Sequence, residues 1–215
     1  METYQTEEEQ IQAIKDWWKE NGRSIIIGLV IGLAAIGGYR YWNEHVQQQS
    51  EQASQLYSKV MDAATEKNTE VALTAGKEVI EKYAATPYAP LTALILGRLA
   101  ADKNDYVSAE AQLSWVVANA SDEGLQQIAR IRLSRILAAQ NKTDEALAMV
   151  SIPAVSGFEV LISELRGDLY LQQKNESSAA EEYRKALSDL KLNPQRRQLI
   201  QMKLDDLAVS IEATS

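Results

Sequence analysis

The chain has 215 residues, of which 46% are hydrophobic and 24% are charged, a composition that suits one ordinary domain plus an additional segment. It contains no cysteine and one histidine, which excludes disulfides, thiolate metal sites, cysteine nucleophiles and most acid–base constellations. Its 22 basic and 30 acidic side chains give a net charge of −8, which repels nucleic acid and predicts no nucleic-acid partner.

Residues 1–23 are predicted to be a cytoplasmic leader. Thr6 and Glu9 have the spacing of a capping box at the start of a helix, and Asn21-Gly22 is typical of a helix end. The apolar residues that share one face of this helix are Ile11, Ile14 and Trp18. The pattern predicts a short amphipathic helix on the cytoplasmic surface of a membrane; a frayed polar tail with interfacial tryptophans is the alternative.

An uncharged segment, residues 24–39, follows between Arg23 and Arg40. As a helix it spans about 24 Å, and the flanking arginines can extend to the surfaces of a hydrocarbon layer about 30 Å thick. The aromatic residues suited to the two interfaces are Trp17, Trp18, Tyr39, Tyr41 and Trp42. We therefore predict a single transmembrane helix over residues 24–42.

A cleaved signal peptide is the alternative interpretation of this segment, because Ala35-Ile36-Gly37 resembles a small-x-small cleavage site. The leader argues against cleavage, since it is acidic and carries two tryptophans, whereas signal peptides begin with a short basic region. Three basic residues precede the uncharged segment 24–39 and two follow it within twenty residues. This bias predicts a cytoplasmic N-terminus and a translocated C-terminal portion.

Small residues recur on one face of the predicted span. Gly28 and Gly32 form a GxxxG pair, a pattern that lets a second membrane helix approach closely. The residues of this predicted transmembrane packing face are Ser24, Gly28, Gly32 and Ala35. Glycine is common in membrane helices, so an unpartnered, lipid-facing stripe is the alternative.

Residues 43–193 are predicted to form about four helix pairs. Apolar residues recur there with helical spacing, and no alternating strand pattern occurs. Four pairs of small residues stand twelve positions apart on either side of a short polar turn: Ala63 and Ala75, Gly97 and Ala109, Ser134 and Ala146, Gly167 and Ala179. Two helices can pack closely at such positions.

The fourth pair most clearly resembles a tetratricopeptide repeat. Its matching residues are Gly167, Tyr170, Ala179, Tyr183, Ala186 and Pro194. The amphipathic segment 194–215 that follows is predicted to be the terminal capping helix that a solenoid needs. The predicted fold class is all-α: one N-terminal transmembrane helix followed by a tetratricopeptide-like α-solenoid.

Taken together, the acidic leader, the single span with its WW…R…GxxxG…YRYW arrangement and the degenerate repeats resemble the YfgM type of ancillary translocon subunit. The resemblance implies a bacterial inner-membrane protein with its repeat domain in the periplasm. It also implies association with the Sec translocon (SecYEG) and the periplasmic chaperone PpiD, in support of unfolded secreted chains. The alternative is a structural envelope assembly or division protein that bridges complexes without handling client polypeptides.

If the pairs stack as tetratricopeptides do, the first helix of each pair lines a concave face. The residues predicted to line a partner-binding groove there are Leu91, Leu94, Arg98, Ile128, Ile131, Arg135, Leu161, Glu164 and Asp168. Such a groove suits an amphipathic helix or an unfolded apolar segment. The Lys/Asn clamp of tail-binding tetratricopeptide proteins is missing, which disfavours capture of a C-terminal carboxylate. The alternative is that the chain's own first or terminal helix buries these residues.

Catalytic chemistry has little support in the sequence. His45 has only Glu44 beside it near the predicted membrane surface, where a solvated histidine is the simpler interpretation. The sequence has no phosphate loop, nucleophile elbow or zinc-ligand spacing. We expect a protein that is not an enzyme, has no cofactor, metal or small-molecule substrate, and acts by binding other proteins.

Overall fold

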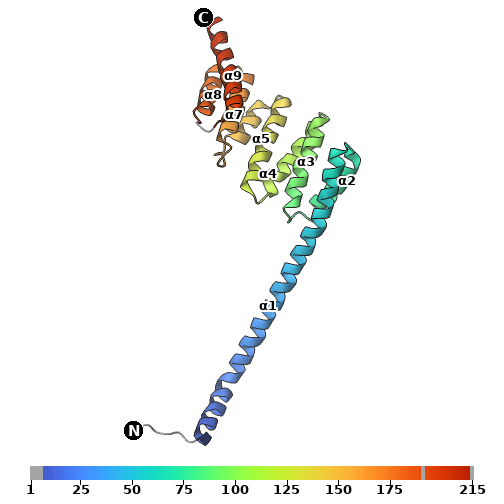
Figure 1. The fold of residues 1–215 in the computed structure, drawn as a ribbon, viewed down its shortest axis with the longest axis vertical. Coiled ribbons are helices and arrows are strands. Elements are labelled where there is room, and N and C mark those ends of the chain that lie inside the picture. Colours follow the sequence, from blue (N-terminus) through green and yellow to red (C-terminus); the bar gives the residue numbers. More distant parts are fainter. Residues whose placement is uncertain (1–6, 190–191, 214–215) are drawn as a thin grey trace, which may run out of the picture. The chain divides into compact units, whose positions relative to one another are not determined.

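The computed structural model describes residues 7–189 and 192–213, and in these ranges every regular element is an α-helix (Figure 1). The helices are α1 (Glu7–Thr65), α2 (Thr69–Lys82), α3 (Tyr88–Asp102), α4 (Tyr106–Asn119), α5 (Glu123–Ala139), α6 (Thr143–Val150), α7 (Glu159–Gln172), α8 (Glu176–Leu187) and α9 (Pro194–Ala213). Two compact units divide between Glu51 and Gln52, inside α1. The predicted all-α fold class is confirmed.

In the first unit, α1 passes through Asn21-Gly22 without ending, so the helix end predicted there is wrong. The Asn21 side chain donates a hydrogen bond from Nδ2 to the carbonyl oxygen of Trp17, 3.0 Å away and one turn earlier. Gly22 does not adopt the positive φ with which a glycine ends a helix. Thr6, the predicted N-cap, lies outside the described residues.

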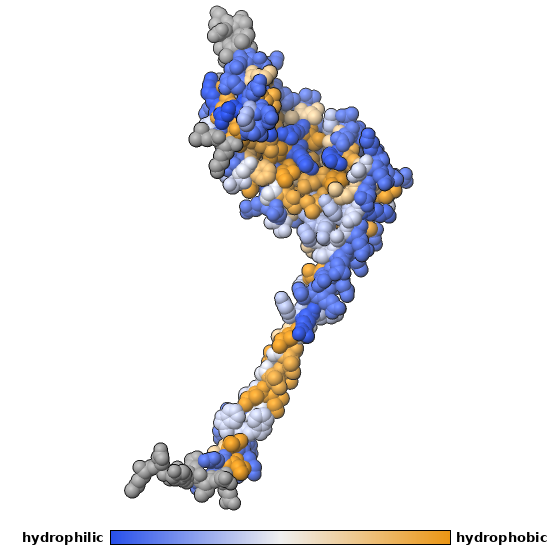
Figure 2. Space-filling model, viewed as in Figure 1, coloured by the Kyte–Doolittle hydropathy of each residue, from blue (hydrophilic) through white to orange (hydrophobic). Residues whose placement is uncertain are grey.

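Among the described residues, α1 is the one helix long and apolar enough to cross a membrane, with a mean hydropathy of 1.6 over an 18-residue window. Its apolar side chains are exposed there, from 41% at Ile25 to 63% at Ile31. Figure 2 shows them as an orange section of the helix between more hydrophilic sections. A continuous exposed apolar section is suited to a non-aqueous environment, because its backbone groups are already bonded within the helix.

The second unit, from Gln52 onward, is built from helix pairs. The end of α1 packs with α2, α3 packs with α4, α5 with α6 and α7 with α8, and α9 then packs on α8. Figure 1 shows α2 to α9 following one another through this unit in sequence order. The first helices of successive pairs are also neighbours, since α5 contacts both α3 and α7. This is the arrangement of a tetratricopeptide-like solenoid.

Small residues allow the two helices of each pair to approach closely. All eight of the predicted small residues are buried. Ser134 donates a hydrogen bond from Oγ to the carbonyl oxygen of Ala146 at 2.9 Å, directly across the third pair. A Cβ atom at Gly167 would collide with the ring of Tyr183. The prediction that these positions bring helices together is confirmed.

The turns inside the pairs share one backbone conformation. Each contains a residue with a left-handed φ of 60–62°: Lys67, Asn104, Asn141 and Lys174. The side chains that then cap the next helix, by accepting a hydrogen bond from a backbone N–H three residues on, are Asn68, Asp105 and Asn175. The third pair lacks this cap at Lys142, and its α6 has only eight residues.

Candidate partner-binding surface

The nine residues predicted to line a groove lie on α3, α5 and α7, and we call the surface that they define the groove face. Leu94, Ile131 and Glu164 are buried; Leu91, Ile128, Leu161 and Asp168 are half-buried; Arg98 and Arg135 are exposed. Leu94 and Ile131, exposed by only 6% and 3%, belong to the hydrophobic core of the repeats. A partner could therefore reach the flanking residues but not these two.

On α3 and α5 the groove face borders a pocket of about 270 Å³. Its lining consists of buried Gly97, Leu113 and Ile136, half-buried Ala101, and the exposed arginines Arg98, Arg132 and Arg135. Figure 2 shows hydrophobic residues gathered over α3, α4 and α5, with hydrophilic groups among them. The pocket thus combines an apolar interior with three cationic groups.

Arg132 is a residue of this pocket that sequence reasoning missed. It stands four positions after Ile128 and three before Arg135, so helical periodicity alone would have placed it on the same face. Its Nη1 donates a long hydrogen bond, 3.5 Å, to the carbonyl oxygen of Leu94. Loss of hydration, and then the charges of Arg98 and Arg135, lower the pKa of Arg132, but an arginine remains protonated at neutral pH.

On α7 two of the three groove-face residues, Glu164 and Asp168, contact α9. Arg196 Nη2 and Lys203 Nζ lie 2.6 Å and 2.9 Å from the two carboxylate oxygens of Glu164. Lys203 Nζ also lies 2.7 Å from Oδ1 of Asp168, and the same oxygen accepts a hydrogen bond from the hydroxyl of Tyr183 at 2.7 Å. Glu164 and Asp168 are thus engaged within the chain.

The pKa shifts in this cluster agree with its geometry. Burial opposes ionisation of Glu164, yet hydrogen bonds from Lys203 and Arg196 hold its pKa below the usual value. Burial likewise opposes the charge on Lys203, but Asp168 and Glu164 raise its pKa. Burial, and then the hydrogen bond to Asp168, raise the pKa of Tyr183, so that its hydroxyl stays a donor. At neutral pH Glu164 and Lys203 are therefore charged, and their ion pair helps to hold α9 on α7.

The predicted transmembrane packing face lies in the other unit. Ser24, Gly28, Gly32 and Ala35 share one side of α1 and are exposed. A Cβ atom at Gly28 or Gly32 would meet no atom within 4 Å. Within the described residues, nothing therefore packs against these two positions.

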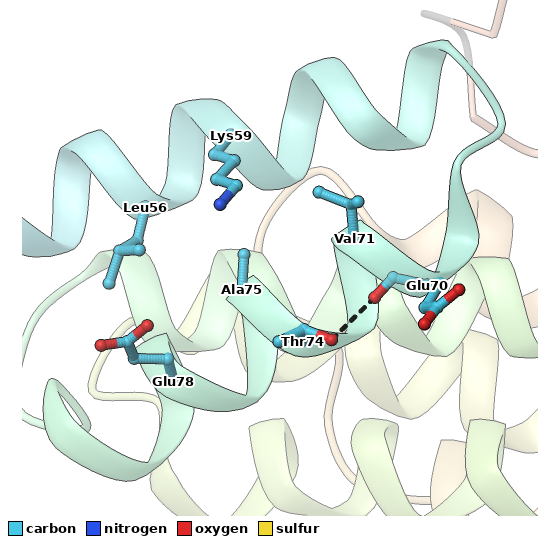
Figure 3. A pocket seen from close by; sticks show the side chains of 7 residues that line it. All are labelled: Leu56, Lys59, Glu70, Val71, Thr74, Ala75 and Glu78. Carbon is cyan, nitrogen blue, oxygen red and sulfur yellow. Dashed lines mark hydrogen bonds between the residues drawn. The ribbon is translucent and has the colours of Figure 1, made fainter.

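A second pocket, of about 210 Å³, lies between the end of α1 and α2 (Figure 3). It is lined by Leu56, Lys59, Glu70, Val71, Thr74, Ala75 and Glu78. Figure 3 shows Lys59 extending from α1 toward α2, and Thr74 Oγ1 donating a hydrogen bond to the carbonyl oxygen of Glu70 at 3.0 Å. Sequence reasoning did not predict this pocket. In the part of the chain that is described, no three potential metal ligands cluster.

Comparison with known proteins identifies relatives along almost the entire chain. The family model described as tetratricopeptide repeat-like domain matches residues 15–209. Proteins named ancillary SecYEG translocon subunit are similar to it: that of Escherichia coli (strain K12) is 29% identical over 97% of this chain and 100% of its own length. Those of Haemophilus influenzae and Neisseria gonorrhoeae are 29% and 27% identical, over 94% and 96% of this chain and 97% and 100% of theirs. These relatives confirm the resemblance to YfgM-type proteins, and the match to more than half of the chain shows that it belongs to the tetratricopeptide repeat-like domain family.

Proposed function

We propose that this chain is an ancillary subunit of a bacterial SecYEG translocon, anchored in the inner membrane by residues 24–42 of α1. The observation that carries the proposal is the similarity, over at least 94% of the chain, to relatives named for that role. The similarity includes both the apolar section of α1 and the helix pairs. A repeat domain alone would be weak support, because one fold serves many functions.

In the proposed topology the leader, residues 1–23, is cytoplasmic. The repeats over 43–193 and the capping segment 194–215 are periplasmic. Support comes from the three basic residues before the uncharged segment 24–39 against two within twenty residues after it. A reporter enzyme that is active only outside the cytoplasm, fused after Ser215, should be active while the chain stays in the membrane fraction. Activity in a soluble chain that has lost its N-terminus would instead support a cleaved signal peptide.

The repeat domain acts, in this proposal, as a scaffold without catalysis. Its partners are a membrane-anchored periplasmic chaperone of the PpiD type and unfolded secreted chains that leave the channel. The support is the open part of the groove face, where half-buried Leu91 and Ile128 lie on the same helices as exposed arginines. A surface that offers apolar and cationic groups together suits polypeptide segments.

Co-purification tests the proposal most simply. The full chain with a C-terminal affinity tag is extracted from bacterial membranes in mild detergent, and the proteins that accompany it are identified by mass spectrometry. We expect the three SecYEG subunits and the chaperone, each enriched over a preparation from a single-pass membrane protein of similar abundance. Absence of SecYEG from repeated preparations would contradict the proposal.

The same preparation tests the transmembrane packing face. Gly28→Leu with Gly32→Leu adds bulk at the predicted contact, whereas Val30→Leu with Gly37→Leu adds bulk on the opposite side of the helix. We expect a partial loss of SecYEG from the first variant, because single transmembrane contacts are modest and the repeats provide a second attachment. Equal recovery from both variants would show that this face contacts lipid.

A further inference from the structure

Three arginines surround the pocket between α3, α4 and α5. Arg98 comes from α3, Arg132 and Arg135 come from α5, and all three line the same space of about 270 Å³. Within the described part of the chain none of them forms an ion pair. Like charges brought together without a counter-ion repel one another, so an anion that entered the pocket would relieve the repulsion.

The missing counter-ion is informative because the chain is rich in carboxylates. It has 30 acidic side chains against 22 basic ones, and two cations of α9, Arg196 and Lys203, are paired with Glu164 and Asp168 on α7. The arginine pocket is therefore a local positive site on a molecule whose overall field repels anions. Such a site concentrates an acidic partner at one place on the surface.

The buried lining shows that an anion alone would not complete the site. Gly97, Leu113 and Ile136 are buried residues that present no charge to the pocket, and Ala101 is half-buried. A cavity of about 150 Å³ lined by aliphatic residues already accommodates benzene, so this volume is large enough for one branched aliphatic or aromatic side chain. The pocket thus offers room for an apolar group directly beside three guanidinium groups.

We infer that this pocket binds an internal segment of a partner polypeptide in which an Asp or Glu carboxylate stands next to a large apolar side chain. The carboxylate pairs with Arg98 and Arg135 in the charge-assisted geometry that guanidinium groups favour. The apolar side chain contacts Leu113 and Ile136. The inference rests on the proposed role as a protein-binding scaffold and specifies what kind of segment that scaffold recognises.

Other anions match only part of the site. Inorganic phosphate would satisfy the arginines but leave the apolar lining unused. A nucleic acid would meet the repulsion of a chain with a net charge of −8. A polypeptide segment supplies the charge and the apolar group from neighbouring residues, which is how extended recognition segments act on helical grooves.

Selection from a random library tests the inference and does not require the partner to be identified first. The probe is a phage library of random twelve-residue peptides, and the target is the full chain in nanodiscs of zwitterionic lipid. We expect enriched sequences that place Asp or Glu next to Leu, Ile, Val or Phe. Enriched sequences without acidic residues would overturn the inference, as would a selection that enriches nothing over empty nanodiscs.

Matched variants then locate the binding on the chain. The most enriched sequence is made as an amidated fluorescent peptide, and its dissociation constant is measured by fluorescence anisotropy. Arg98→Gln with Arg135→Gln should weaken binding at least about tenfold, because two charge-assisted hydrogen-bonding groups are lost. Arg184→Gln with Lys185→Gln removes the same charge from exposed positions on α8 and should leave the dissociation constant within about twofold, since those charges act only at long range.

A third variant separates pocket binding from diffuse attraction. Ala101→Leu keeps all three arginines but fills the pocket, so it should also weaken binding at least about tenfold if the apolar side chain enters. Unchanged binding by Ala101→Leu would overturn the pocket, because electrostatic attraction alone would then suffice. Displacement of the peptide by inorganic phosphate, beyond the effect of chloride at equal ionic strength, would instead indicate a site for free anions.

These outcomes are distinguishable from failure of the proposed function. If the arginine variant loses the peptide but still co-purifies with SecYEG, both proposals stand and the pocket serves a different partner. If the peptide result fails while co-purification succeeds, only the pocket inference is overturned.

Discussion

The groove face has different chemistry on α5 and on α7, although both are first helices of neighbouring pairs. One position after the small residue of each helix stands Arg135 on α5 but Asp168 on α7. Three positions before it stand Ile131 on α5 but Glu164 on α7. Arg196 and Lys203 of α9 pair with Glu164 and Asp168, whereas no ion pair in the described chain engages Arg135. At the position after the small residue, α5 thus carries a cation that no ion pair in the described chain engages, and α7 carries a carboxylate that pairs with α9.

The largest effect is expected from reversing a charge in the region that α9 covers. Lys203→Glu places a third carboxylate against Glu164 and Asp168, where Lys203 Nζ lies 2.9 Å and 2.7 Å from their oxygens. We expect a loss of about 2–3 kcal/mol in the local stability of α9, because the ion pairs become repulsive in a partly buried site. Hydrogen exchange of the α9 amides in the full chain measures this loss.

The control for that variant is Lys77→Glu, which makes the same charge change at a solvent-exposed ion pair on α2. It should change stability by no more than about 0.5 kcal/mol. Equal acceleration of α9 exchange in both variants would mean that the effect comes from net charge, and no acceleration in Lys203→Glu would mean that apolar contacts alone hold α9.

The two regions also differ in how tightly their helices pack. A Cβ atom at Gly167 would overlap the ring of Tyr183, whereas one at Gly97 would lie 3.2 Å from Leu113 Cγ, a tight contact that a shift of a few tenths of an ångström relieves. Gly167→Ala should lower the free energy of unfolding by about 1–3 kcal/mol. Gly97→Ala should change it by less than about 1 kcal/mol, since the helix propensity of alanine offsets the contact. Thermal unfolding followed by circular dichroism distinguishes the two, and equal shifts would contradict the difference in packing.

The charged cluster makes the stability of α9 depend on pH. The pKa of Glu164 is lowered in the folded chain, so its contribution is present above the unfolded pKa of about 4.3 and is lost as the pH falls through the folded value. The pKa of Lys203 is raised, so its contribution is present below about 10.4 and is lost as the pH rises through the folded value. Protection of the α9 amides, taken relative to the intrinsic exchange rate at each pH, should be highest between these limits.

Glu164→Gln provides the control for this pH dependence. It removes the titrating carboxylate while keeping the side-chain volume, and it should flatten the acidic limb of the profile at the cost of lower stability at neutral pH. If the stability of α9 fell with pH as steeply as in the unmodified chain, other carboxylates would cause the pH dependence. Glu110, whose pKa is lowered by Gln140 and Lys142, is one such carboxylate.

Short-range sequence patterns predicted the repeats well, because the two helices of each pair are adjacent in the sequence. Ser134 and Ala146, or Gly167 and Ala179, stand twelve residues apart, and their burial follows from helical spacing alone. The predicted end of a helix at Asn21-Gly22 failed because an Asn-Gly pair only permits such an end, and Asn21 instead bonds within the continuing helix. The apolar residues that come after this pair favour continuation of the helix, and two residues alone do not decide where it ends.

The residues that share the face of one helix could be predicted from the sequence, but the ion pairs that join two helices could not. Helical periodicity placed Arg98 and Arg135 on the groove face. A search that also counted positions three or four residues from those chosen would have included Arg132. The pairing of Glu164 with Arg196 and Lys203 joins residues 32 and 39 positions apart, and no short-range pattern contains it. The carboxylates that pair with α9 can therefore be identified only from the folded structure.

Photo-crosslinking in membranes compares the open and the self-covered parts of the groove face in one assay. A photo-reactive side chain is placed at half-buried Ile128 on α5 or at Asp168 on α7 in the full-length chain. We expect Ile128 to capture a separate polypeptide, because nothing in the described chain covers the arginines beside it, whereas Asp168 should crosslink to α9 of its own chain. If both positions captured the same partner, or if Ile128 captured none, the division of the groove face into an open and a covered part would be wrong.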